Sequence, residues 1–290
     1  MKDYIIVSFS GGKDSTAMLL RMLETGERID EVICCDTYME YPAMYRHIEK
    51  IKALVEKAGV KFTELRSEKS FEYYLFEHVP KRRAAVYEKQ QVGYSWPGPR
   101  TRWCTSRLKL DVINKYFKAL EKQYNLIHCV GIAFDEMYRL DRPNNQAKGQ
   151  RHPLVKWQWT EEDCLQYCYK RGFDWEGLYE IFRKEEGRSP RVACWCCPLQ
   201  SLEDLRILRK QFPDLWARLM EMGERTWRTF RPGYFTQDLE KRFDLEDELT
   251  ERGYSVTNRA FHSDLKKLLA GESSIPEIIE ERERQMRIPN

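Results

Sequence analysis

A short glycine-containing segment near the start of the chain limits the possible folds more than any other feature. The segment Ser8–Thr16 follows an apolar run, residues 4–7, and precedes residues with helical spacing. Gly11 and Gly12 permit positive φ and lack the Cβ atoms that would block a ligand, so backbone N–H groups can converge on an anion. The positive N-terminal end of the following helix adds to this attraction. The segment therefore predicts a phosphate-binding strand–loop–helix unit.

The side chains of this loop suit the same purpose. Ser10 and Ser15 supply hydroxyls and Lys13 supplies a positive charge, whereas Asp14 stands where a Walker A loop needs Ser or Thr. The run Ser10–Ser15 resembles SGGxDS, the PP-loop of the ATP pyrophosphatase superfamily. Members of that superfamily bind the pyrophosphate end of ATP and usually adenylate a substrate. A glycine-rich turn without a ligand is the alternative interpretation.

The pattern of strands and helices predicts an α/β fold. Apolar runs indicate strands at 4–9, 31–36, 61–65 and 125–132, with helical patterns between them. We expect a doubly wound, mostly parallel sheet with a C-terminal helical region. The predicted domains are a nucleotide-binding domain over 1–157 and a mainly helical region over 158–290, which carries the cysteines at 194–197.

Composition narrows the partners and the cellular compartment that we expect for this chain. The chain has 290 residues, of which 42% are hydrophobic and 33% charged, and its net charge of +3 gives no indication of a nucleic-acid partner. No apolar run approaches the roughly 18 residues that span a membrane. Residues 1–3 lead directly into the first strand, so we expect no signal peptide and a cytoplasmic protein.

Two further segments belong to the predicted site because ligands bind beyond the carboxyl ends of parallel strands. Asp36 ends the second strand, as a ligand or as a cap for the next helix, and Gly131 ends the fourth. The stretch 79–102 is irregular, with several prolines and glycines. It carries basic residues suited to closing over an anionic substrate: Lys81, Arg82, Arg83, Arg100 and Arg102.

The nine cysteines are clustered in a way that favours metal or redox chemistry in a cytosolic chain. Cys194 and Cys197 form a C-x-x-C pair, with Cys196 between them, and two thiolates at that spacing can hold one metal or cluster. Cys104 is the best third ligand because it lies at a predicted helix N-terminus, which favours a thiolate. Core packing accounts for the other cysteines in strands and helices: Cys34, Cys35, Cys164 and Cys168.

Together these motifs resemble the phosphoadenylyl-sulfate (PAPS) reductase family of the PP-loop superfamily, over roughly residues 4–200. The family implies an adenine nucleotide α-hydrolase-like fold, and in the adenylyl-sulfate reductases a Cys-Cys pair plus a later C-x-x-C holds a 4Fe–4S cluster. The resemblance rests on Ser10–Ser15, on Asp36, Thr37, Glu40 and Pro42, on Arg102–Lys109, on Gly131, Glu136 and Arg139, on Pro153, Leu154, Trp159 and Thr160, and on Cys194–Pro198.

The chain departs from that family pattern in two places. Trp103 stands where the first Cys of the pair would be, so only Cys104, Cys194 and Cys197 match cluster ligands. No cysteine follows Cys197, so the nucleophilic C-terminal thiol of the sulfite-releasing reductases has no counterpart. Three-cysteine clusters with an open iron resemble those of PP-loop sulfurtransferases, which favours an adenylating sulfurtransferase over a reductase.

This interpretation assigns roles to named residues. The loop, including Ser10, Gly11, Gly12 and Ser15, would hold the β- and γ-phosphates of ATP, and Asp14, together with Asp36, would hold Mg²⁺. Lys13 would neutralise charge on the phosphates, helped by Arg107, Lys109 or Arg139. Cys104, Cys194 and Cys197 would hold a 4Fe–4S cluster that carries or activates sulfur. The expected partners are an adenine nucleotide, a sulfur donor protein and an acceptor that is tRNA, DNA or a small metabolite.

Two alternatives stay open at this point. One is a phosphoadenylyl-sulfate or adenylyl-sulfate reductase that uses an external thiol, with Cys196 as the substitute nucleophile. The other is a non-catalytic nucleotide-binding module whose thiols hold structural Zn²⁺, for which Cys196 or His152 would supply a fourth ligand.

Overall fold

The computed structural model describes residues 1–79, 92–141, 146, 149–184 and 189–287. It forms two compact units, unit 1 over residues 1–200 and unit 2 over residues 201–290. The sequence pattern placed a domain boundary at 157 instead. Residues 158–200, including the cysteine segment 194–197, belong to unit 1 with the phosphate loop.

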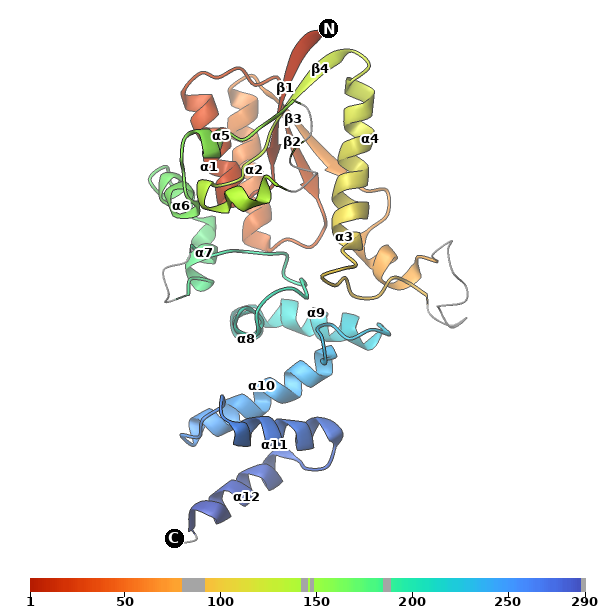
Figure 1. The fold of residues 1–290 in the computed structure, drawn as a ribbon, viewed down its shortest axis with the longest axis vertical. Helices are drawn as coiled ribbons and strands as arrows, with labels where there is room; N and C mark the ends of the chain where they lie inside the picture. Colours follow the sequence, from red (N-terminus) through yellow and green to blue (C-terminus); the bar gives the residue numbers. More distant parts are fainter. Residues whose placement is uncertain (80–91, 142–145, 147–148, 185–188, 288–290) are drawn as a thin grey trace. The chain divides into compact units, whose positions relative to one another are not determined.

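Unit 1 is built on a five-stranded sheet in the order β3-β2-β1-β4-β5, in which every pair of neighbours is parallel (Figure 1). The central strand pairs on both sides, with Val7 opposite Val32 and opposite Cys129. This arrangement confirms the predicted α/β fold, while the short β5 was not predicted. The strands are β1 (Lys2–Phe9), β2 (Glu31–Asp36), β3 (Lys61–Arg66), β4 (Tyr124–Cys129) and β5 (Gln150–Arg151).

Helices cover both faces of the sheet, with α1 and α2 on one side and α4 on the other (Figure 1). Ile6, Ile33 and Leu65 pack against the apolar side of α4, and burial of such side chains contributes about 1.5–3 kcal/mol each. The helical segments of unit 1 include α1 (Lys13–Glu24), α2 (Pro42–Lys57), η1 (Tyr73–Glu77), α3 (Trp103–Thr105), η2 (Ser106–Leu110), α4 (Asp111–Leu120), η3 (Phe134–Arg139), α5 (Pro153–Lys156), α6 (Glu161–Tyr169), η5 (Trp175–Gly177) and α7 (Leu178–Ile181).

Two element boundaries differ from the sequence prediction near the site. β4 ends at Cys129 rather than at 132, so Gly131 lies in the segment after the strand. The helix expected from Leu108 begins instead as the π-helical turn η2, with Leu108 fully buried, and continues as α4. The turn contacts the end of β2, where Cys35 Sγ donates to Leu108 O at 3.1 Å.

Unit 2 is helical, as predicted. Its core is made by apolar residues of α10, α11 and α12, such as Leu245, Phe261 and Ile278. The last helix was expected to be solvated or frayed, but Ile278 and Ile279 are buried because they fall on one side of α12. The helices are α8 (Leu202–Gln211), α9 (Pro213–Glu224), α10 (Thr236–Glu251), α11 (Arg259–Ala270) and α12 (Ile275–Arg287).

Within the described ranges, no helix is long and apolar enough to cross a membrane.

Candidate nucleotide and thiol site

The loop between β1 and α1 takes its shape from Gly11. Its φ is +80°, and a Cβ there would lie 2.8 Å from Met44 Sδ, so no other residue fits without strain. Gly12 has a φ of −72°, and the nearest atom to an added Cβ would be Tyr179 Oη at 3.5 Å. The sequence suggested positive φ at either glycine, but only Gly11 uses it. Gly12 instead lines an open cavity.

Two serines brace the loop from within. Ser10 N–H donates to Ser15 Oγ at 3.1 Å, the two hydroxyls lie 3.0 Å apart, and Ser15 Oγ donates to Gly12 O at 3.0 Å. The N–H groups of Gly12, Asp14 and Ser15 have no protein acceptor in the described part of the chain, as is usual at the start of a helix. These N–H groups are therefore available to a phosphate.

Two aromatic side chains from η5 and α7 hold the loop backbone in place. Trp175 Nε1 donates to Gly11 O at 2.8 Å, and Lys13 N–H donates to Tyr179 Oη at 2.9 Å. Both rings are buried, and the Trp175 ring lies 4.4 Å from the ring of His47. Burial lowers the pKa of His47 to about 3, so its imidazole is uncharged at neutral pH where it packs against Trp175. We call Trp175 and Tyr179 the aromatic clamp.

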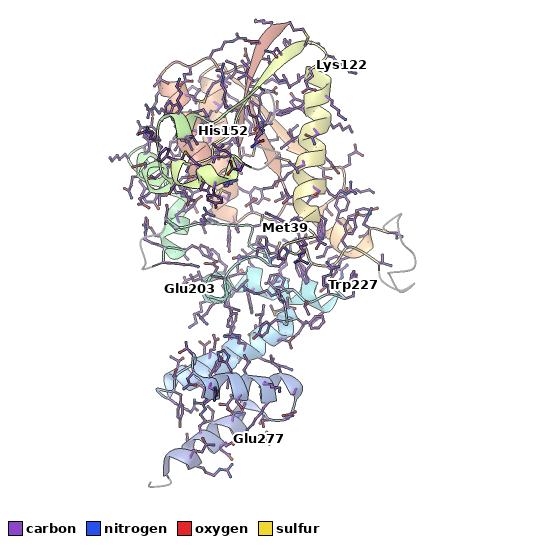
Figure 2. All side chains as sticks on the ribbon, in the orientation of Figure 1. Met39, Lys122, His152, Glu203, Trp227 and Glu277 are labelled. Carbon is purple, nitrogen blue, oxygen red and sulfur yellow. The ribbon has the colours of Figure 1, made fainter. Side chains whose placement is uncertain are left out.

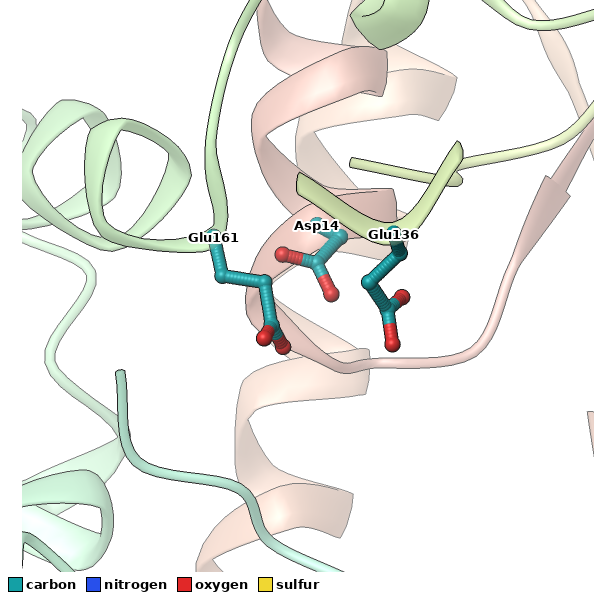
Figure 3. Close-up of side chains that lie close together, drawn as sticks. All are labelled: Asp14, Glu136 and Glu161. Carbon is teal, nitrogen blue, oxygen red and sulfur yellow. The ribbon is translucent and has the colours of Figure 1, made fainter. Parts of the chain in front are cut away.

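Three carboxylates converge beside the loop. Asp14 of α1, Glu136 of η3 and Glu161 of α6 each offer one oxygen, and these oxygens lie within 4.8 Å of one another (Figure 3). Among the described residues, no other group of three His, Cys, Asp or Glu side chains comes this close. The buried Asp14 Oδ1 has no hydrogen bond. Carboxylate oxygens in this number suit Mg²⁺, which also takes phosphate and water ligands.

Cationic side chains offset this negative charge. Lys13 Nζ lies 2.7 Å from Glu161 Oε1, and Arg191 Nη2 lies 3.1 Å from Glu161 Oε2 while also bonding to Glu136. Arg139 pairs with Glu136 as well. Arg139 was expected to face a phosphate directly, whereas here its guanidinium supports Glu136.

Burial raises the pKa of Asp14 to about 6, with the neighbouring Glu161 and Glu136 charges acting in the same direction and Lys13 opposing them. The pKa of Lys13 is raised: burial lowers it, but the charges of Asp14 and Glu161 outweigh that effect. Lys13 therefore stays charged at neutral pH, while Asp14 changes protonation state within the range of ordinary assays.

A cavity of about 270 Å³ joins the phosphate loop to the cysteines. Met39, labelled in Figure 2, is one of its lining residues and lies in the segment that follows β2. The loop contributes Ser10 and Gly12, and the remaining walls come from distant segments. These other lining residues are Thr37, Glu40, Met44, Phe71, Pro97, Arg102, Cys104, Thr105, Lys109, Val192, Ala193, Cys194, Cys196, Cys197 and Pro198.

The three predicted ligand thiols share this cavity without contacting one another closely. Cys104, Cys194 and Cys197 all line it, although they do not form a group within 4.8 Å. Burial raises the pKa of Cys194, and the Glu40 charge adds to the rise while Lys109 opposes it. Burial also raises the pKa of Cys197. In this environment a bound cation would favour the thiolate forms.

Trp103 stands where the family pattern has the first cysteine of a Cys-Cys pair. Trp103 is buried, and its Nε1 donates to Ser95 O at 2.9 Å. Its ring lies 4.9 Å from that of Phe71 and 5.9 Å from that of Tyr94. Trp103 thus stabilises the wall of the cavity and offers no metal ligand.

Three residues, Arg107, Lys109 and Arg139, were candidates for the cation that assists Lys13, and of these Lys109 shares the cavity with the thiols. It lines the cavity, whereas Arg107 is exposed and pairs with Asp111 at 2.9 Å. Burial lowers the pKa of Lys109, but its electrostatic interactions with Cys194 and Glu40 outweigh this effect, so the net pKa is raised. The lysine therefore supplies a lasting positive charge inside the cavity.

The two other predicted ligand positions have local structural roles. Asp36 accepts hydrogen bonds from Tyr38 N–H at 2.7 Å and from Tyr45 Oη at 3.0 Å, and it pairs with Arg66. It neither lines the cavity nor caps α2. Gly131 allows close packing, because a Cβ there would lie 3.1 Å from the Ser15 backbone.

The basic lid predicted over 79–102 can be traced only in part. Residues 80–91, which include Lys81, Arg82 and Arg83, lie outside the described residues. Of the remaining basic residues, Arg102 lines the cavity, and the Gly98 and Thr101 backbones pair across a tight turn.

Several site residues were not predicted from the sequence. Glu161 follows the helix-capping Thr160, whose side chain exchanges hydrogen bonds with Asp163, and only its position on α6 reveals its role. Arg191, Trp175 and Tyr179 carry no motif signal. Glu136 and Glu40 were among the residues that carry the family resemblance, without an assigned function.

Comparisons with known proteins place the chain in a family. The family model for the phosphoadenosine phosphosulfate reductase domain matches residues 4–200. Two uncharacterized proteins of Methanocaldococcus jannaschii are also similar. MJ0066 is 26% identical over 226 residues, covering 75% of this chain and 41% of the relative. MJ0973 is 23% identical over 229 residues, covering 77% of this chain and 49% of the relative. The chain thus spans less than half the length of either relative.

A search of solved structures found the U34-tRNA thiolase NcsA from Methanococcus maripaludis with its [4Fe-4S] cluster. The TM-score is 0.35 at 15% sequence identity, and the match covers 75% of this chain and 69% of the thiolase chain. A likeness this distant says nothing about what the present chain binds.

Proposed function

This chain belongs to the phosphoadenosine phosphosulfate reductase domain family, and from that premise we propose that it is an ATP-dependent, adenylating sulfurtransferase-like enzyme. One observation carries the proposal: the phosphate loop and the thiols of Cys104, Cys194 and Cys197 line the same cavity. A nucleotide held by Ser10 and Gly12 would therefore face the thiols directly.

The loop fits the phosphates of ATP with Mg²⁺. The free N–H groups of Gly12, Asp14 and Ser15 can bind phosphate oxygens, and Gly12 leaves the space open. Asp14 Oδ1 has no hydrogen bond and lies 3.4 Å from Lys13 Nζ, and with the nearby Glu136 and Glu161 carboxylates it would offer the oxygens that Mg²⁺ prefers. In this proposal Glu136 and Glu161 take the place that the sequence gave to Asp36.

The proposed chemistry is adenylation of the acceptor. An acceptor oxygen attacks the α-phosphorus of ATP, a new P–O bond forms, and the bond to the bridging oxygen breaks to release pyrophosphate. Negative charge develops on that bridging oxygen. Lys13 and Lys109 would stabilise this charge, and such preorganised charges commonly supply several kcal/mol of transition-state stabilisation. Adenylation makes the acceptor carbon susceptible to attack by sulfur.

The thiols fit a 4Fe–4S cluster with Cys104, Cys194 and Cys197 as ligands. The fit rests on their chemistry, because these three thiols line a single cavity together with Cys196, Lys109 and the loop residues Ser10 and Gly12. When bound, the cluster would carry or activate the sulfur that reaches the acceptor. Cys34 and Cys129 are buried in the sheet and take no part.

We expect the acceptor to be tRNA, DNA or a small metabolite, and a donor protein to be a partner. We place the enzyme in the cytoplasm.

An anaerobic assay of pyrophosphate release tests the proposal. Purified protein is given Mg²⁺, ATP and, in separate reactions, total tRNA, DNA or low-molecular-weight extract. Release that depends on one acceptor and is lost in Lys13→Ala supports the function. ATP binding without any acceptor-dependent release would reject adenylation and favour the non-catalytic module.

A parallel assay of sulfite release tests the reductase alternative. Adenylyl-sulfate and its 3′-phosphorylated form are supplied with thioredoxin or a dithiol. We expect no sulfite above background, because Cys196 is 1% exposed and burial raises its pKa well above the usual range. Sulfite production that disappears in Cys196→Ser would replace the sulfurtransferase proposal with the reductase.

A further inference from the structure

The three carboxylates beside the phosphate loop stand on three separate elements. Asp14 belongs to α1, Glu136 to η3 and Glu161 to α6 (Figure 3). Like charges this close repel one another, so the carboxylates stay within 4.8 Å only if the elements that carry them are held together. A residue that contacts all three elements would therefore fix the geometry of the proposed Mg²⁺ site.

Trp159 contacts each of these elements. The centroid of its ring lies 4.5 Å from Cζ of Arg21, which stands about two turns along α1 from Asp14 and so on the same side of that helix. The ring also lies 4.5 Å from the ring of Tyr167 on α6. The carbonyl oxygen of Trp159 accepts a hydrogen bond at 2.7 Å from the N–H of Phe134, the first residue of η3. Trp159 is thus a common support of α1, η3 and α6.

The side chain of Arg21 contacts two indole rings in this region. Its Cζ lies 4.5 Å from the ring centroid of Trp157 and at the same distance from that of Trp159. A guanidinium near the face of an indole is attracted by the negative charge of the ring face. These contacts therefore tie the side of α1 that carries Asp14 to the segment that leads into α6.

The turn that presents the two rings is strained. Gln158, between the two tryptophans, has a φ of +58°, a left-handed conformation that favours glycine. Its N–H donates to Val155 O at 3.1 Å, and Trp159 N–H donates to Leu154 O at 2.9 Å, which closes α5 in the manner of a Schellman motif. Such a conformation in a residue other than glycine persists only where the surroundings hold it, and functional sites are a common place for it.

We propose that Trp159 is a positioning residue, which holds Asp14, Glu136 and Glu161 at the spacing that Mg²⁺ needs. The inference rests on the proposed Mg²⁺ site and adds a residue that is neither one of the carboxylates nor part of the cavity lining. Loss of the indole ring removes the contacts with α1 and α6, while the backbone hydrogen bond to η3 stays. The carboxylates can then move apart and lower their repulsion, at the expense of metal affinity.

Binding of Mn²⁺, which takes the same kind of octahedral oxygen site as Mg²⁺, tests this role. Electron paramagnetic resonance of the free ion gives the affinity for Mn²⁺ alone, without nucleotide. We expect binding about tenfold weaker in Trp159→Leu, the lower end of effects seen around metal sites, and largely restored in Trp159→Phe, whose ring can keep the contacts with Arg21 and Tyr167. Trp157→Leu is the matched control, because it removes the other indole ring at Arg21 and should bind Mn²⁺ as the parent does.

A second variant keeps the test valid if Trp159→Leu does not fold. Arg21→Met removes the charge that the two rings attract, keeps a long side chain, and should weaken Mn²⁺ binding about fivefold. Parental affinity in Arg21→Met, or in a folded Trp159→Leu, would overturn the role of Trp159 while the metal site stands. Equal loss of affinity in Trp157→Leu and Trp159→Leu would overturn it too, since a general loss of packing would then explain both.

Glu161→Gln separates failure of this inference from failure of the site. If the parent and Glu161→Gln bind Mn²⁺ equally, or the parent binds none, the carboxylates do not hold the metal, and the Mg²⁺ site and the role of Trp159 fall together. A parent that binds Mn²⁺ but releases no pyrophosphate with any acceptor would reject adenylation and leave the role of Trp159 in place.

Discussion

Lys13 Nζ lies 2.7 Å from Glu161 Oε1, although the two residues are 148 positions apart. Helix α6 makes this contact, since its capping box fixes Thr160 and so places Glu161 at the first turn. Removing one partner of a buried ion pair typically costs about 3–5 kcal/mol, because a charge is left unpaired. The phosphate loop and the segment after β5 are therefore one structural unit, with Lys13 held charged beside the three carboxylates.

The protonation of Asp14 should control metal binding. Its pKa is raised to about 6 by burial and by the neighbouring carboxylates, and only the ionised form can bind Mg²⁺. Metal binding therefore releases a proton below this pH. We predict that Mg²⁺ affinity in the presence of ATP rises up to about tenfold per pH unit below pH 6 and levels off above it.

Asp14→Asn provides the matched comparison, measured by calorimetric titration of Mg²⁺. The variant should show no change with pH in this range and should release pyrophosphate about 100-fold more slowly, since metal assistance commonly supplies several kcal/mol. Unchanged pH dependence in Asp14→Asn would mean that another group titrates.

The two loop glycines should respond differently to substitution. Gly12→Val adds methyl groups at the cavity wall, where the backbone is extended and tolerates them, so the variant should fold and lose ATP binding. Gly11→Ala forces a side chain into the left-handed region, at a cost of about 1–2 kcal/mol, and against Met44. Chemical denaturation should therefore show lost stability for Gly11→Ala alone. A folded Gly12→Val variant that binds ATP normally would contradict the proposal that the loop at Gly12 binds the phosphates.

Loss of either hydrogen bond from the aromatic clamp to the loop backbone should weaken ATP binding. Trp175→Phe and Tyr179→Phe each remove one hydrogen bond to the loop backbone, worth about 1 kcal/mol. We predict about fivefold weaker ATP binding for each. Trp216→Phe is the control, because it removes an indole hydrogen bond to Glu240 in unit 2. Equal ATP affinity in Trp175→Phe and Trp216→Phe would show that the clamp does not position the loop.

The sequence predicts the central sheet well because its strands are continuous apolar runs. β1, β2 and β3 match the predicted ranges within two residues at each end, and their parallel pairing follows from the intervening helices. β5 has only two residues, too few for a period to show. The π-helical turn before α4 contains the fully buried Leu108, and no local pattern in the sequence reveals this turn.

The candidate site is less visible in the sequence because tertiary contacts assemble it. The motif Ser10–Ser15 indicates the loop, and the C-x-x-C spacing indicates the thiols, since both are local patterns. Glu161 and Arg191 carry no such pattern, because their partners lie far away in the chain. Asp36 matched the family pattern and the right sheet edge, but its neighbours Tyr38 and Tyr45 bind its carboxylate.

The central claim, that three distant thiols of the nucleotide cavity hold one iron–sulfur cluster, is tested most directly by iron and sulfide analysis after anaerobic purification. The parent protein should contain about four irons per chain. Cys104→Ala, Cys194→Ala and Cys197→Ala should each lose them, while the core variants Cys34→Ala and Cys129→Ala should retain them. Stoichiometric zinc without iron, or iron that persists in all three ligand variants, would contradict the claim.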